Sequence, residues 1–229
     1  MSDFLYRHIG PNREEQMEML AVVGAHSLAD LLAKVVPPNI VGSKPLALPA
    51  ALSEVEALAE LRDGGLVGAI GAGMNGWEMP LELARAGLFD AFLLAGRYTL
   101  LEQDSLPFMD YCAQHDISVV IGGVYNSGLL ANPKLGAHDN YAPVSSERLE
   151  RAFALQRVCL RHGVPLRAAA LQFPLGHSAV SSVLMAARSV SQLEDNVQQF
   201  EVQIPLELWA DLLREGLLED RVPTPQEQS

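Results

Sequence analysis

Histidines and cysteines have side chains that bind metals and act as nucleophiles, so their spacing could indicate a reactive site. Cys112 and Cys159 lie far apart in segments with a helical pattern, and neither belongs to a CxxC pair. No HxH or HxxxH spacing and no adjacent carboxylate pair accompanies the histidines at positions 115, 138, 162 and 177. We therefore expect no metal site, two buried reduced thiols, and histidines that lie on the surface or are satisfied by neighbours.

Glycine-rich and nucleophile motifs are the second source of chemistry. The chain has no GxxxxGK[ST] and no GxSxG, which argues against P-loop and α/β-hydrolase sites. The glycine-rich segment GAGMNG, residues 71–76, is interpreted as something other than the phosphate-binding turn of a Rossmann fold. The sequence motifs alone therefore name no reaction.

The elements that would position a site follow a repeating pattern. Apolar runs of strand length, at residues 67–71, 90–95, 117–122 and 180–185, alternate with amphipathic segments at residues 77–86, 105–116, 145–162, 191–200 and 206–215. Four β-α units in a row predict an α/β fold with a parallel sheet covered by helices. It is either an open doubly wound sheet or part of a (β/α)8 barrel, and four units make half of a barrel.

The first 60 residues have a different pattern. Asn12 with Glu15, Ser27 with Asp30, and Ser53 with Glu56 are the cap spacings of three short helices. A linker-like stretch, VGSKPLALP at residues 41–49, separates the last two. No strand candidate occurs here, so we expect a small helical appendage.

Composition limits the class of protein. The chain has 229 residues and a net charge of −12, from 16 basic and 28 acidic side chains. This balance argues against nucleic acid or an anionic membrane as partner. No signal-like N-terminus and no stretch of roughly 18 apolar residues is present. We therefore expect a cytoplasmic protein.

Several ordered motifs resemble one family. They are AIGAGMNGWE (69–78), DAFLLAGRYTLLEQ (90–103), ISVVIGGVYNSGLLA (117–131), NYAP (140–143), HGVPLRAAALQFPLGHSAV (162–180) and AARSVSQLEDN (186–196). Together they resemble the second half of the aldo/keto reductases that oxidise free sugars, the L-fucose or D-threo-aldose 1-dehydrogenase group. The resemblance implies a partial TIM-type barrel, an NAD or NADP cofactor, and a small-molecule aldose as substrate.

Residues 4 to about 60 resemble a different family. FLYRHIGPNREEQMEML, SLADLLAKVVPPNI and PLALPAALSEVEALAELR are similar to the extreme N-terminus of the glycine decarboxylase P-protein. That family's pyridoxal-phosphate lysine lies far beyond such a stretch, so no pyridoxal phosphate site is expected. Both families can supply a helix like ALAELR, residues 57–62, and we therefore interpret the chain as a chimera joined there.

The reductase resemblance assigns four cofactor-binding residues. Asn75 matches the residue that hydrogen-bonds the nicotinamide carboxamide, Ser127 matches a pyrophosphate contact, Arg188 matches the residue at the 2′-phosphate end, and Asn196 matches an adenine contact. Simpler roles stay open: Asn75 as a turn residue, the loop at Ser127 as a mere connection, and Arg188 as a solvated side chain.

Two positions depart from the family pattern. Its ring-stacking aromatic falls at Gly122 and its carboxamide-binding Gln at Ala95, so cofactor binding is expected to be weak or lost. Tyr98 could serve as a pocket aromatic or belong to the core.

The family's catalytic Tyr, Lys, Asp and His come from four strands that have no counterpart before Leu66. Tyr6, His8 and Lys44 lie in the appendage, outside any barrel context, so no catalytic residue is assigned. The resulting prediction has an appendage at residues 1–60, a half barrel at 61–221 and a disordered tail at 222–229. It is a truncated oxidoreductase without hydride transfer of its own, or alternatively a non-enzymatic fragment that self-associates or binds a partner through exposed barrel edges.

Overall fold

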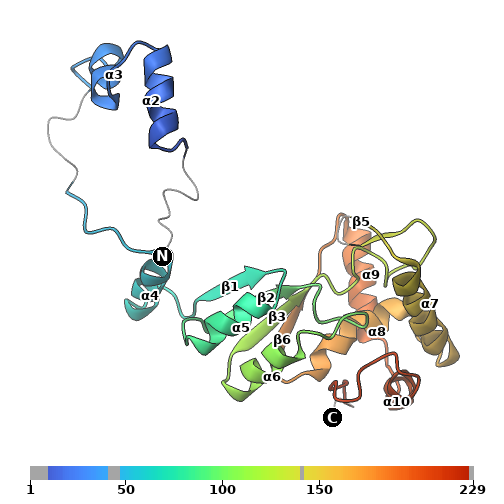
Figure 1. Cartoon of the computed structure of the whole chain (residues 1–229). Helices are drawn as coiled ribbons and strands as arrows, with labels where there is room; N and C mark the ends of the chain where they lie inside the picture. Colours follow the sequence, from blue (N-terminus) through green and yellow to red (C-terminus); the bar gives the residue numbers. More distant parts are fainter. Residues whose placement is uncertain (1–9, 41–46, 140–141, 227–229) are drawn as a thin grey trace. The chain divides into compact units, whose positions relative to one another are not determined.

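The computed structural model describes residues 10–40, 47–139 and 142–226, and the chain divides into two compact units, residues 1–58 and 59–229 (Figure 1). In the first unit, α2 (Arg13–Val22) begins at Asn12 with the expected capping box. Ser27 caps α3 (Leu28–Val35) through the backbone N–H of Asp30. Neither helix buries a residue, so the two contribute little apolar burial.

The helix α4 (Glu54–Asp63) spans the boundary between the two units. Its start is fixed as the sequence predicts, because the Glu56 carboxylate accepts hydrogen bonds from both the backbone N–H and the hydroxyl of Ser53. These bonds lower the pKa of Glu56.

The second unit is built on a four-stranded parallel sheet, as predicted. Its strands are β1 (Gly71–Met74), β2 (Ala91–Ala95), β3 (Ser118–Gly122) and β6 (Val180–Leu184), hydrogen-bonded in the order β1-β2-β3-β6. The helices α5 (Glu78–Arg85), α6 (Leu106–Gln114), α7 (Ser146–Arg161), α8 (Leu166–Gln172), α9 (Val190–Glu201) and α10 (Leu206–Arg214) lie along the chain between and after them. None of the helices in the described ranges is long and apolar enough to cross a membrane.

β1 begins four residues later than the apolar run at residues 67–71 predicts. The Asp90 carboxylate accepts the backbone N–H of Ile70 at 2.8 Å, and the Ile70 carbonyl accepts the backbone N–H of Asp90 at 2.9 Å. Pairing with β2 then starts at Gly71, where an added Cβ would lie 2.7 Å from the Ala91 carbonyl oxygen. Glycine is therefore required where the two strands first meet.

The position of β1 also decides whether the glycine-rich segment 71–76 can be the phosphate-binding turn of a Rossmann fold. Its spacing does fit GxGxxG, but Gly71 and Gly73 lie inside β1 instead of in the turn that follows a strand. The Rossmann fingerprint requires its glycines at the turn, where a helix N-terminus meets the phosphates. Position in the fold, and not the spacing of the glycines, thus excludes that site.

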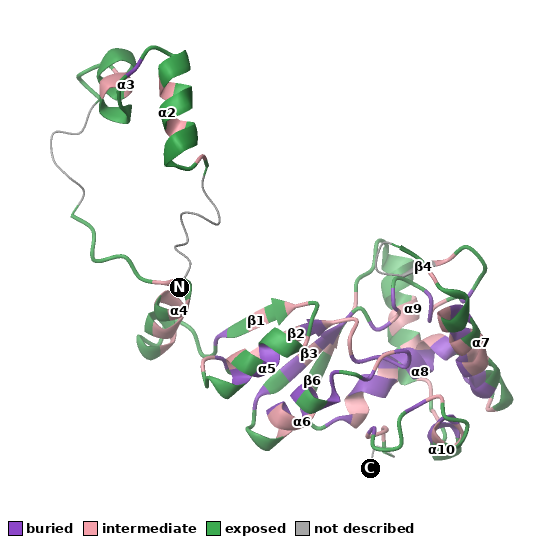
Figure 2. Cartoon of the chain, viewed as in Figure 1, coloured by how far each residue is buried: buried purple, intermediate pink, exposed green. Residues whose placement is uncertain are grey.

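Buried and less buried residues alternate along β2 (Figure 2). Phe92, Leu94, Val119 and Ile121 point to one face and are at most 2% exposed. The alternate residues point to the other face, where Leu93 and Val120 are only partly buried and the remaining positions are mostly glycine, alanine and serine. The helices thus cover one face of the sheet, and the inner face is partly open.

A cluster of aromatic side chains lies at the centre of the C-terminal half of this unit. Tyr98 stacks on Phe173 with ring centroids 5.3 Å apart, and Phe173 also contacts Trp209 of α10. Phe173 belongs to the 3-10 helix η1 (Phe173–Gly176), which follows α8 directly. Neither α8 nor the two-residue strands β4 (His138–Asp139) and β5 (Ala142–Pro143) are predicted from the sequence.

The C-terminal segment differs from the expectation of a disordered tail. Val222 is 5% exposed, and the backbone of residues 223–225 lies against Gly176. An added Cβ at Gly176 would be 2.5 Å from the carbonyl carbon of Thr224. The absence of a side chain at Gly176 therefore makes room for this segment, which the structure describes as far as residue 226.

Candidate functional site

The predicted site residues follow the carboxyl ends of parallel strands. Asn75 comes directly after β1, Ser127 lies in the loop after β3, and Arg188 lies between β6 and α9. Because the strands are parallel, these ends share one edge of the sheet. The fold therefore brings the connections that carry these three residues to one edge, and Asn196 lies further along α9.

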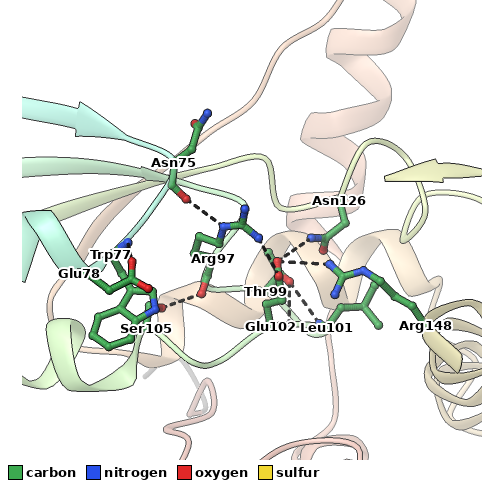
Figure 3. Close-up of polar contacts among 10 residues, drawn as sticks. All are labelled: Asn75, Trp77, Glu78, Arg97, Thr99, Leu101, Glu102, Ser105, Asn126 and Arg148. Atoms are coloured by element: carbon green, nitrogen blue, oxygen red, sulfur yellow. Dashed lines mark hydrogen bonds and ion pairs between the residues drawn. The ribbon is translucent and has the colours of Figure 1, made fainter. Parts of the chain in front are cut away.

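A polar network fixes three of the strand ends (Figure 3). Glu102 lies at its centre and accepts the Arg97 guanidinium on Oε1 at 2.8 Å. Its Oε2 lies 3.2 Å from Arg148 of α7 and 3.5 Å from the amide nitrogen of Asn126. Arg97 in turn donates from Nε to the Asn75 carbonyl oxygen at 2.9 Å. One carboxylate thus connects the segments that follow β1, β2 and β3 to α7.

A tight turn places Glu102 there. Thr99 and Glu102 form a short antiparallel bridge, and the Thr99 hydroxyl accepts the backbone N–H groups of Leu101 and Glu102, each at 3.2 Å. Ser105 holds the same segment by donating from its hydroxyl to the Arg97 carbonyl at 2.6 Å. The turn directs the Glu102 side chain back toward the strand ends.

The loop after β3 has an unusual backbone. Asn126, Ser127 and Gly128 have φ values of 45°, 56° and 95°, a left-handed region that is costly for the first two. Most of the loop's N–H groups bond within it, those of Asn126 and Gly128 among them. The loop is therefore less open to an anion through its backbone than the sequence suggests, and the exposed Ser127 side chain is the group it presents.

Asn126 is a polar residue of this loop that lacks a full set of partners. It is 4% exposed, and its Oδ1 is buried without a hydrogen bond in the described part of the chain. A buried amide oxygen without a donor costs about 1–3 kcal/mol. The fold therefore holds an unsatisfied acceptor at this loop.

The two departures from the family pattern lie next to each other. Ala95 and Gly122 are partners across the β2–β3 pair. A Cβ added at Gly122 would meet only the Ala95 Cβ and a Leu93 methyl carbon, both at 3.9 Å. A Cβ is therefore accommodated at Gly122, next to Ala95, at the two positions where the resemblance places an aromatic ring and a Gln.

Beyond this pair the two backbones approach closely. Gly96 donates its N–H to the Gly122 carbonyl oxygen at 2.9 Å, and Gly96 and Gly123 have φ values of 71° and 66°. A Cβ at Gly123 would lie 3.2 Å from the Gly96 nitrogen. The close approach therefore favours glycine at Gly123, while at Gly96, where an added Cβ would meet nothing within 4 Å, the left-handed backbone alone favours it.

Arg188 and Asn196 are positioned by α9. The Ser189 hydroxyl accepts the Gln192 N–H and caps the helix, while the Arg188 N–H donates to the Gln192 side chain at 2.8 Å. The Arg188 side chain is exposed. Asn196 is partly buried and lines a cavity of about 350 Å³ between α8, β6 and α9.

Two further cavities lie beside the Glu102 network. The smaller, about 240 Å³, is lined by Gly76, Trp77, Glu78, Arg97, Glu102 and Asp104. The larger, about 690 Å³, lies against α7, and its lining includes five carboxylates but only two arginines, Arg148 and Arg151. A dinucleotide carries negative phosphates, so this carboxylate-rich surface does not suit it.

The remaining candidates belong to the core. Burial raises the pKa of Tyr98 and Tyr125, and the hydroxyl of each is buried without a hydrogen bond among the described residues. Tyr98 is thus a core residue and not a pocket aromatic. Burial also raises the pKa of Cys112 and Cys159 to about 12, so the expected buried thiols are confirmed.

The histidines have local partners where the structure describes their side chains. His177 lies 3.3 Å from Asp110, His162 lies 3.0 Å from Asp211, and His115 stacks on Tyr111. Within the described ranges, no group of three or more metal-binding side chains comes together. Tyr6, His8 and Lys44, the appendage residues considered for catalysis, lie outside the described residues.

The sequence reasoning missed Arg97, Glu102 and Arg148. A signal was present in GRYTLLEQ, since this polar segment follows directly on a strand end, where parallel sheets place binding residues. The pairing of Glu102 with Arg148, 46 positions later in the chain, leaves no trace in local sequence.

Comparisons with known proteins identify the family of the chain. The model of the aldo/keto reductase family matches residues 36–213. The chain is 43% identical over 164 residues to pyridoxal 4-dehydrogenase of Microbacterium luteolum, covering 71% of this chain and 48% of that protein. It is 36% identical over 176 residues to D-threo-aldose 1-dehydrogenase of a Pseudomonas species, covering 76% and 52%. The chain thus spans about half the length of these relatives.

A second similarity covers a shorter segment. Over 61 residues the chain is 56% identical to glycine dehydrogenase (decarboxylating) of Bordetella avium, which is 27% of this chain and 6% of that protein. Among solved structures, the apo form of the aldo-keto reductase AKR11C1 from Bacillus halodurans matches with a TM-score of 0.58 and 24% identity, over 76% of this chain and 58% of that one. This likeness shows the fold. The family match over residues 36–213, with which the four parallel strands agree, places the chain in the aldo/keto reductase family.

Proposed function

We propose that residues 61–221 are the cofactor-holding part of an NAD(P)-dependent oxidoreductase that oxidises a free aldose at C1. The observation that carries the proposal is the set of polar residues on the connections that follow parallel strands, namely Asn75, Ser127 and Arg188, with Asn196 on the following helix. Members of the family use NAD(P), and two relatives are named for the oxidation of an aldose and of pyridoxal. We prefer an aldose as the substrate because motifs such as AIGAGMNGWE (69–78) and AARSVSQLEDN (186–196) resemble those of the sugar dehydrogenases.

Each residue has a distinct task in this proposal. The exposed Arg188 guanidinium binds the 2′-phosphate, and Asn196 contacts the adenine from the cavity beside α9. Ser127 contacts the pyrophosphate from the loop after β3, where its side chain is exposed. Asn75 holds the nicotinamide carboxamide, with its backbone fixed by Arg97. Bound NAD(P) would supply the acceptor for a hydride.

The proton is a separate requirement. Oxidation at C1 needs a base that removes the hydroxyl proton while the hydride leaves. Tyr98, Tyr111 and Tyr125 are the tyrosines within the described ranges, and burial raises the pKa of Tyr98 and Tyr125 instead of lowering it. We infer that this chain binds the dinucleotide weakly and does not transfer hydride alone. A non-enzymatic, partner-binding role is the alternative, and the open sheet edges favour it.

The test is a titration of the purified chain with NADPH and NADH, followed by cofactor fluorescence, with L-fucose turnover recorded on NADP⁺ and NAD⁺. Arg188→Gln should weaken NADPH binding about tenfold, the value of one charge-assisted contact to phosphate, and leave NADH binding unchanged. Arg157→Gln is the matched control, because Arg157 is exposed on α7 away from the site.

The results for cofactor binding and for turnover distinguish the proposed functions. Binding without turnover supports the proposal, and equal effects of Arg188→Gln on both cofactors remove the phosphate assignment. Turnover would show that a base exists in the chain, which contradicts the inference on hydride transfer. No binding of either cofactor would leave the partner-binding role.

A further inference from the structure

Both edges of the parallel sheet are open. β1 pairs only with β2 and β6 only with β3 among the described residues, so each edge strand presents unpaired backbone groups on its outer side. The register of β3 with β6 also shifts between Val119 and Val120, yet pairing continues to Leu184. Such edges pair with other chains unless something blocks them.

Neither edge carries the usual protection. Proteins protect edge strands with charged side chains or proline, but residues 64–77 and 178–187 contain no Lys, Arg, Asp, Glu or Pro. All the charged side chains that give the chain its net charge of −12 therefore lie outside these two ranges. Repulsion between copies is weakest where the sheet is open.

An apolar surface continues the β6 edge. On α9 the side chains of Val190, Leu193, Val197 and Phe200 are 73%, 55%, 49% and 46% exposed. The last three approach the cavity of about 350 Å³ that β6 also lines. The salt bridge between Arg167 and Asp195, at 2.5 Å, fixes α9 on α8, so this surface is held in place.

We propose that a second copy of this chain covers these surfaces and that two copies form a closed barrel of eight parallel strands. A two-fold axis along the strand direction places β6 of each copy beside β1 of the other, and the strands remain parallel at both junctions. Four strands from each copy give eight, the number at which side chains fill the interior of a parallel barrel. One operation removes both edges and encloses both partly open inner faces.

A second copy fits better than a short peptide would. A peptide strand covers one edge and leaves the other edge and the inner face exposed. The partner must offer an uncharged parallel edge on each side and a half-covered inner face, and this chain has all three. The assembly is also closed, so it stops at two copies.

The experiment measures the mass of the full chain by sedimentation from about 1 to about 100 μM, a range that spans micromolar dissociation constants. The expected result is twice the 24.8 kDa chain mass at the upper concentrations. Phe200→Lys should raise the dissociation constant at least tenfold. Leu160→Lys should leave it unchanged, since Leu160 is an equally apolar helix residue, 67% exposed on α7.

Hydrogen exchange of the wild-type chain makes the test independent of any variant. The backbone amides of β1 and β6 should gain protection as the concentration rises through the dimer transition, while those of β2 and β3 stay protected throughout. A monomer at every concentration, growth beyond two copies, or a dimer with no added protection in β1 and β6 would overturn the proposal.

Discussion

Replacing Glu102 by Gln tests whether one carboxylate holds the strand ends together. The substitution keeps the shape of the side chain but removes the charge that Arg97 and Arg148 share at 2.8 and 3.2 Å. A hydrogen bond to a charged group contributes about 1.5–3 kcal/mol when it is shielded from water. The Arg97 and Arg148 side chains are 36% and 25% exposed, so solvent screening reduces each contribution. We expect a loss of about 2 kcal/mol in the free energy of unfolding.

The assay is thermal and urea unfolding of the full chain, followed by circular dichroism. For a unit of this size, about 2 kcal/mol corresponds to a fall in Tm of roughly 4–8 °C. Glu150→Gln is the control, because Glu150 is exposed on α7. If Glu102→Gln and Glu150→Gln unfold within about 0.5 kcal/mol of each other, which is the ordinary effect of a surface change, the network does not hold the site.

Three further predictions follow from single positions. Gly122→Tyr should tighten dinucleotide binding about threefold to tenfold, since a Cβ at Gly122 meets only the Ala95 Cβ and a Leu93 methyl carbon at 3.9 Å and ring stacking contributes about 0.5–1.5 kcal/mol; a folded variant with unchanged affinity would contradict this. In the folded chain burial lowers the pKa of the His177 imidazole, and the hydrogen bond to Asp110 offsets this shift only in part. Below the ordinary value of 6.5 the unfolded chain therefore binds more protons than the folded chain. The stability that is present above that pH is lost as the pH falls toward the folded-state pKa. His177→Gln should remove this part of the pH dependence in urea unfolding, and identical pH profiles would refute the assignment. Gly176→Ala should displace residues 223–225, because its Cβ would lie 2.5 Å from Thr224, and it should make the C-terminal segment sensitive to protease; an unchanged digestion pattern would count against that packing.

The alternation of apolar runs and amphipathic segments was enough to predict the parallel sheet, because β2 and β3 are short and almost wholly apolar. β1 was placed too early, since its boundary depends on the Asp90 carboxylate that accepts the Ile70 N–H. That contact joins positions 20 apart, and local periodicity does not reveal it. The short helix α8 was missed because it runs directly into η1 without a break.

The site was predictable only as far as the resemblance reached. Asn75, Ser127, Arg188 and Asn196 were assigned from motifs, and their roles remain predictions. The Glu102 network was not foreseen, because an acidic residue in a turn is usually solvated and its arginine partners come from two other segments. Long-range pairing of charges is a property of the fold, which a single sequence does not record.

The close approach of Gly96 and Gly123 limits how this site can evolve. A side chain would be strained at either position because both residues have a left-handed backbone, and at Gly123 its Cβ would also lie 3.2 Å from the Gly96 nitrogen. A substitution at either glycine is therefore disfavoured on its own. Selection for a new substrate would therefore act on the segments that follow these glycines, at Arg97 and in the loop of Asn126 and Ser127, while the two strand ends stay fixed.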